Sequence, residues 1–190
     1  MVKALIVGLF ILSVIAITLF SLRSSSNSFP KGNTPKPEEK ASVAQTTLSF
    51  SPDPLTVSED TGKIDLIIDT GKENKVTAVQ VAIKYNPRHL PSVDITPGSF
   101  FQNPIVLFKK IDDKKGIISF AVALPPGSGG ENGQGTFAHI TFTTERDSNE
   151  ITGLQFLPET VVAATHINTS TLKEAINGRI VIQVPEKQPL

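Results

Sequence analysis

The sequence predicts an all-β, two-layer β-sandwich with jelly-roll or Greek-key connections, preceded by one N-terminal transmembrane helix. Three observations lead to this fold class. An uncharged apolar run lies close to the N-terminus. After residue 46, apolar and polar residues alternate with a period of two in successive segments, and turn-forming Pro, Gly and Asn residues separate these segments. Beyond the apolar run no long segment has the 3.6-residue period of a helix, so about eight or nine short strands are expected.

Residues 1–22 are expected to form a membrane anchor. The run from Ala4 to Leu22 is uncharged and is about long enough to cross the core of a bilayer as one helix. It is followed by Arg23 without the small-residue cleavage site of a secretory signal, which favours an uncleaved anchor over secretion after cleavage. The basic start before the run is typical of export, so the domain is expected outside the cytoplasm. Counting the basic residues after the helix favours the opposite orientation.

Residues 23–46 have the composition of a linker, because Ser, Asn, Pro, Lys and Glu predominate and offer little apolar surface to bury. Repeated prolines make such a segment semi-rigid, so it is expected to hold a folded domain away from the membrane. Residues 47–184 have the length of one domain, and residues 185–190 form a short tail.

Charge and cysteine content exclude several functions for this domain. The chain has 18 basic and 18 acidic residues and no dense basic patch, so nucleic-acid binding is not expected. It has no cysteine, which excludes disulfides, thiolate catalysis and zinc sites built on sulfur. An exported domain of this kind must depend on its hydrophobic core.

The strands follow from the alternation along the chain. Ile64, Leu66 and Ile68 share one face of a strand. In residues 76–85 one face carries four core residues and the other carries four outward residues, Ala78, Gln80, Ala82 and Lys84. Residues 105–111 and 116–124 are expected to form a hairpin. Further strands are predicted over 136–144, 154–156, 161–164 and 179–184.

An ordered series of segments resembles a known family. These segments are LSFSPDPLTV, GKIDLIIDTG, VTAVQVAIKYNPRHL, VDITPGSFF, GTFAHITFT, ITGLQFLPETVVAAT and INGRIVI. Tyr85-Asn86-Pro87 ends a strand in a turn, Pro97-Gly98 turns the chain before two phenylalanines, and Asn177-Gly178 precedes the last strand. No one of these motifs is specific, but their order over nearly all of residues 47–184 is similar to that of cohesin domains, which are related to carbohydrate-binding sandwiches.

The resemblance implies a noncatalytic binding function. Cohesins hold the dockerin module of another protein on one exposed sheet face, and calcium stabilises the dockerin rather than the cohesin, so no cofactor is expected on this chain. A membrane-tethered cohesin would be a cell-surface receptor, with a polysaccharide-degrading enzyme as one kind of partner.

By the same resemblance, Ala78, Gln80, Ala82 and Lys84 lie on a strand that the family uses to bind its partner. Many dockerin-binding cohesins carry Asn and Asp where this chain has Ala78 and Gln80, so the partner differs or the fold serves another ligand. An ordinary solvated sheet face is an equally good interpretation. Phe137 and His139 alternate with core residues in their strand, so an interface role is one interpretation for them, and packing beneath a loop is the alternative for Phe137.

Two other functions fit the sequence less well than partner binding. Direct polysaccharide binding usually needs exposed Trp or Tyr side chains, yet the chain has no Trp and its only Tyr is predicted to face the core. Hydrolysis needs paired carboxylates or a nucleophile beside a base, and Asp65 and Asp69 are more simply solvent-facing strand residues. The three histidines match no metal-ligand spacing, so neither a catalytic nor a metal site is expected.

Overall fold

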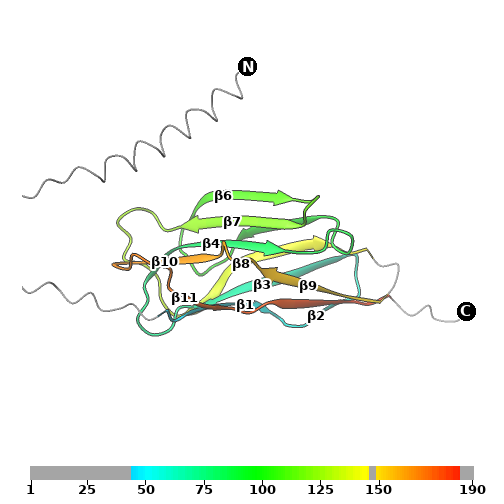
Figure 1. The fold of residues 1–190 in the computed structure, drawn as a ribbon, viewed down its shortest axis with the longest axis horizontal. Coiled ribbons are helices and arrows are strands. Elements are labelled where there is room, and N and C mark those ends of the chain that lie inside the picture. The colour runs from blue at the N-terminus through cyan, green and yellow to red at the C-terminus, as the bar shows by residue number, and fades with distance from the viewer. Residues whose placement is uncertain (1–43, 146–148, 185–190) are drawn as a thin grey trace, which may run out of the picture. The chain divides into compact units, whose positions relative to one another are not determined.

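The computed structural model describes residues 44–145 and 149–184, which form a β-sandwich of twelve strands (Figure 1). The prediction of an all-β sandwich is confirmed. The predicted anchor from Ala4 to Leu22, most of the linker and the tail 185–190 lie outside the described residues. Within the described ranges there is no helix that could cross a membrane.

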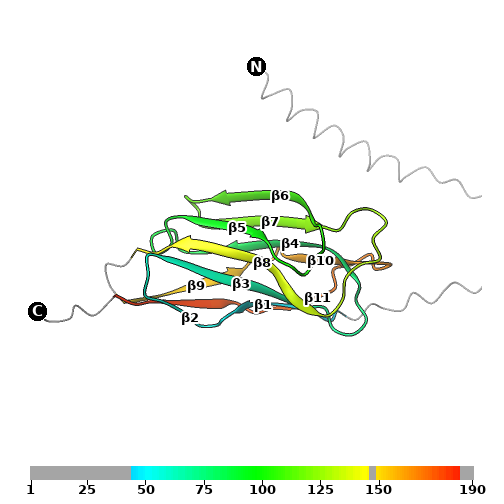
Figure 2. The ribbon, with the colours of Figure 1, turned by 180° about the vertical axis from the view of Figure 1, so that it is seen from behind.

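Two sheets form the layers of the sandwich (Figures 1 and 2). The five-stranded sheet has the order β11 (Leu172–Ala175), β1 (Thr46–Ser51), β3 (Thr61–Asp69), β8 (Gln134–Thr143) and β5 (Val93–Pro97). The seven-stranded sheet has the order β2 (Leu55–Val57), β12 (Gly178–Ile182), β9 (Glu150–Phe156), β4 (Val76–Lys84), β7 (Ile117–Ala123) and β6 (Ile105–Asp112), and β10 (Val161–Ala164) also pairs with β4. The short strands β2 and β11, which the alternation did not predict, pair in parallel with β12 and β1.

The core fills the space between the sheets, and the alternation predicted which residues enter it. Ile64, Leu66 and Ile68 of β3 are fully buried, as are Val81 and Ile83 of β4. The predicted hairpin is also present, since β6 and β7 pair in antiparallel register. Because successive side chains of a strand point to opposite faces, the residues between these core positions must point outward.

Phe137 is an exception to the simple alternation. Leu66 of β3 pairs with Ala138 of β8, but the next residue, Ile67, pairs with Thr136. The register between the two strands therefore shifts by one residue after Leu66. This bulge leaves Phe137 without a partner in β3 and lets it follow Ala138 into the core. The ring is 2% exposed and packs edge-on against Phe101 and at a tilt against Phe120. The expectation that Phe137 contributes to an interface is therefore wrong, and the alternative of a packed side chain is nearer to the structure.

Tyr85 closes the end of the β6–β7 hairpin. Its side chain is 2% exposed, and its hydroxyl donates a hydrogen bond of 3.1 Å to Oδ1 of Asp113 in the hairpin turn. Its backbone N–H donates to the carbonyl of Gly116, whose φ of 62° lies in the region that favours glycine. Burial first, and then the hydrogen bond to Asp113 and the charges of Asp113 and Asp112, raise the pKa of Tyr85 to about 12 from its usual 10.0.

Replacing Tyr85 with phenylalanine is expected to remove a pH-dependent part of the stability. The folded protein holds the phenol proton more tightly than the unfolded chain does, so this stabilisation is complete below pH 10 and is lost as the pH rises towards about 12. Between about pH 9 and 11 the parent should lose about 1 kcal/mol more of its free energy of unfolding than Tyr85→Phe. Urea unfolding at both pH values measures this difference, and equal losses in the two proteins would contradict it.

Candidate functional site

The outward face of the seven-stranded sheet, called here the outer face, has one apolar half and one polar half. Cross-strand register arranges its apolar half in two rows that run over β10, β4, β7 and β6. The first row contains Ala163, Ala78, Ala123 and Ile105, and the second contains Val161, Gln80, Ala121 and Phe108. Val161, Ile105 and Phe108 are 44%, 44% and 42% exposed. Large apolar side chains thus border a floor of alanines that is interrupted by Gln80.

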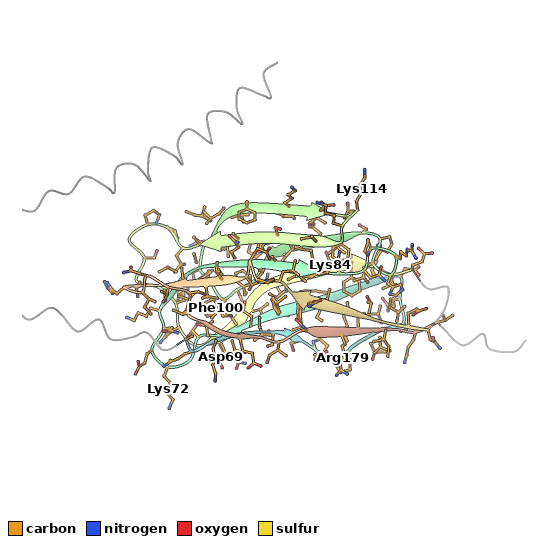
Figure 3. The ribbon with its side chains drawn as sticks, in the orientation of Figure 1. Asp69, Lys72, Lys84, Phe100, Lys114 and Arg179 are labelled. Carbon is orange, nitrogen blue, oxygen red and sulfur yellow. The ribbon has the colours of Figure 1, made fainter. Side chains whose placement is uncertain are left out.

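The polar half lies towards the C-terminal end of β4. Lys84 pairs with Gln155 of β9 on one side and with Ile117 of β7 on the other, and Asp112 of β6 continues the row. Lys110 lies one row nearer to the apolar half. Figure 3 labels Lys84 and, at the same end of the sheet, Lys114 in the hairpin turn. A ligand lying along β4 would therefore meet methyl groups at one end and charged groups at the other.

The two polar candidates on β4 already bind their own main chain. The side-chain amide of Gln80 donates a hydrogen bond of 3.0 Å to the carbonyl of Glu159. The ammonium group of Lys84 donates to the carbonyl of Lys115. Each side chain is fixed by a loop distant in sequence, so each can present only its remaining hydrogen-bonding capacity to a ligand.

The two alanine candidates contribute shape rather than polar contacts. Ala78 and Ala82 pair across the sheet with Ala123 and Ser119, which places them on the predicted outward side of β4. Ala82 is only 5% exposed, and its backbone N–H and carbonyl both bond the hydroxyl of Thr160. Ala78 is the more accessible of the two. A flat surface of this kind accepts a closely packed ligand because no long side chain rises from it.

His139 does not join this face. It lies on β8 of the five-stranded sheet, where its Nδ1 is 2.7 Å from Oδ1 of Asp65 on β3. Lys63 lies 3.8 Å from the same carboxylate oxygen. The structure therefore separates the six predicted site residues: four are on β4, Phe137 is in the core, and His139 is on the opposite sheet.

Sequence reasoning missed the contribution of β6 to the outer face. Ile105, Val106, Leu107 and Phe108 are four successive apolar residues, all between 42% and 59% exposed. The sequence does carry a signal, since a strand buried on one face alternates whereas this run does not. Its exposure follows from the position of β6 at the edge of the sheet.

The described residues contain no cluster of three or more His, Cys, Asp or Glu side chains that could hold a metal ion. Asp65 and His139 form a close pair. The third group in contact with Asp65 is the cation of Lys63, so these contacts do not form a nucleophile beside a base. The described domain therefore has a flat, partly apolar face on one sheet and a face with paired charged groups on the other.

Comparisons with known proteins agree with this geometry. The chain resembles a non-cellulosomal cohesin from the archaeon Archaeoglobus fulgidus at 18% identity and a TM-score of 0.58, over 74% of this chain and 92% of that one. CaCohA2 from Clostridium acetobutylicum is similar at 18% identity and a TM-score of 0.58, over 74% and 95%. The complex of Coh-OlpA with Doc918 from Clostridium thermocellum, described as a type I cohesin–dockerin complex, matches at 13% identity and a TM-score of 0.60, over 73% and 99%.

These structural likenesses are distant in sequence and show the fold. None of the curated proteins matches this sequence. The sequence model of the cohesin domain matches residues 55–182, which is more than half of the chain. The chain therefore belongs to the cohesin domain family.

Proposed function

We propose that this chain is a noncatalytic receptor that binds a dockerin-type module of another protein on its outer face. The observation that carries the proposal is the pair of apolar rows, in which exposed Ile105, Phe108 and Val161 border a floor of alanines. Contiguous exposed apolar surface on a soluble domain marks an interaction site. Several of the similar structures are cohesins in complex with dockerins, which supports the choice of partner class.

The opposite sheet is a weaker candidate for the same function. Its outward side carries Lys63, Asp65 and His139, which satisfy one another. Asp94 of β5 is paired with Lys109 at 2.6 Å. Displacing water from such groups costs free energy unless the partner replaces each interaction, whereas all side chains of the two rows except Gln80 are apolar, and covering them gains free energy from burial.

The chemistry of the outer face limits which side chains a partner can place against it. Ala78 offers no hydrogen bond, and the side-chain amide of Gln80 already donates to Glu159. The partner should therefore present small or aliphatic side chains to the rows, in place of polar groups that would be left unsatisfied there. Lys110, two residues beyond Phe108 on the same side of β6, favours an acidic residue on the partner at the polar end.

Attachment to a membrane and a role in polysaccharide breakdown extend this proposal. The apolar run from Ala4 to Leu22 and the linker after it support an anchor that displays the domain outside the cytoplasm. Retention of a dockerin-bearing enzyme would then raise its local concentration at the cell surface. Direct sugar binding is disfavoured, since Tyr85 is buried and the chain has no Trp to form a stacking platform.

Capture in the presence and absence of calcium tests the proposal. The immobilised full chain is exposed to secreted and surface proteins of the same organism, first in calcium and then in chelator, and bound proteins are identified by mass spectrometry. The expected result is calcium-dependent capture of a protein that carries paired calcium-binding loops, because the dockerin needs the ion to fold. A bait that is folded by circular dichroism and captures no such protein would overturn the dockerin assignment.

A further inference from the structure

The strand β6 is an unprotected sheet edge. Among residues 44–145 and 149–184 it pairs only with β7, so the other side of its backbone faces outward from the sheet. Its N-terminal half, Ile105 to Phe108, is exposed by 44%, 44%, 59% and 42% along the chain. Leu107 is the most exposed of the four, and a register shift between Val106 and Phe108 leaves it without a partner in β7.

The other edges of the two sheets are protected. Edge strands in native proteins are usually short, interrupted by proline or charged, because an open edge accepts a further strand. Here β2 has three residues, β10 and β11 have four each, and β5 ends in Pro97. In contrast, β6 has eight residues and no proline. Its three charged residues, Lys109, Lys110 and Asp112, all lie in its C-terminal half, and Lys109 is held by Asp94 of the other sheet. In its N-terminal half the one protecting feature is the bulge at Leu107.

The first and last described residues both lie on the side of the sandwich away from this edge. Ala44 leads into β1, and Val184 follows β12. Both strands lie at the side of the sandwich away from β6, which Figure 1 shows as β6 at the top and β1 with β2 at the bottom. Within the described residues no strand pairs with the open edge of β6, so this edge can accept a strand of another molecule.

We propose that β6 is a dimerisation edge, on which β6 of a second copy of this chain pairs in antiparallel orientation about a two-fold axis near Leu107. This orientation places the apolar halves of the two strands side by side. Lys109 of each copy then lies opposite Ile105 of the other and Lys110 lies beyond its apolar half, so the lysines of the two copies are at opposite ends of the shared ladder. Parallel pairing would set the lysines of one copy against those of the other, which like-charge repulsion disfavours.

The two-fold arrangement also limits the assembly. An isologous contact uses the same strand of both copies, so the assembly stops at a dimer and cannot extend into a fibre. A short ladder buries less than the roughly 800 Å² per partner of a standard interface, and the dimer is accordingly weak. An axis perpendicular to the sheet keeps the outer faces of both copies on the same side and accessible. The proposal is therefore independent of which partner binds that face.

Disulfide trapping tests the dimer directly, because the natural chain contains no cysteine. The full chain carrying Leu107→Cys is compared with the full chain carrying Ile151→Cys at equal concentration under a mild oxidant. Ile151 is 68% exposed and lies on β9, away from the edge. Residues opposite each other in a ladder come close enough for a disulfide, so Leu107→Cys should give about five-fold more covalent dimer on a non-reducing gel.

A second variant separates the edge from other modes of association. Adding Phe108→Lys to Leu107→Cys places further charges at the axis and should return trapping to the level of Ile151→Cys. Association through another part of the chain would raise trapping at both cysteine positions alike. The proposal is overturned if Leu107→Cys traps no more dimer than Ile151→Cys, or if Phe108→Lys leaves its trapping unchanged. Far-ultraviolet circular dichroism of the reduced variants checks that each is folded.

Discussion

Replacing Ala78 with arginine is expected to weaken binding of the dockerin-type partner by about 100-fold or more. Ala78 lies in the middle of a row of small side chains, between Ala163 and Ala123 on the neighbouring strands. An arginine there would either hold the partner away from the face or be buried as a cation without a counter-ion. The side chain points to solvent in the free protein, so the domain should stay folded. Titration calorimetry with the captured partner measures the affinity.

Thr141→Arg provides the matched control for this substitution. Thr141 is exposed and lies on β8, on the outward side of the five-stranded sheet. The same side chain introduced there should change the affinity by no more than about two-fold, because surface substitutions away from a contact have small effects. If both variants lost affinity equally, or if Ala78→Arg bound normally, the contact would lie elsewhere than on the outer face.

The sequence was sufficient to predict which side of most strands enters the core. A period of two assigns alternate residues to opposite faces, and this rule placed Ile64, Leu66 and Ile68 inside. It also placed Ala78 and Gln80 on the outward side, and both are only partly buried, whereas Val79 and Val81 are buried. These predictions succeeded because the direction of a side chain within a regular strand depends only on its neighbours along the chain.

Features that depend on another strand could not be predicted in this way. The burial of Phe137 results from a bulge in its pairing with β3, and nothing within residues 136–144 encodes that register. Similarly, the hydrogen bonds that hold Gln80 and Lys84 come from loops far along the chain. The exposure of β6 depends on which strand ends the sheet, a property of the whole topology.

Replacing Phe120 with alanine is expected to lower the free energy of unfolding by about 3–5 kcal/mol, the usual cost of removing a buried phenylalanine ring. Phe120 lies on β7, is fully buried, and its ring centroid is 6.1 Å from that of Phe137. Alanine would lose this aromatic contact and leave a cavity that two packed sheets cannot readily close. Urea denaturation followed by circular dichroism measures the change.

Phe108→Ala is the matched control, because it removes the same ring from the adjacent strand β6. Phe108 is 42% exposed and pairs with Ala121, so its ring lies on the outer face rather than between the sheets. Its removal from the monomer should cost less than about 1 kcal/mol. The contrast separates burial from residue type, since strand propensity and the lost atoms are the same in both variants. A loss for Phe108→Ala as large as that for Phe120→Ala would mean that the edge strand is part of the core, and the outer face would then lack its apolar border.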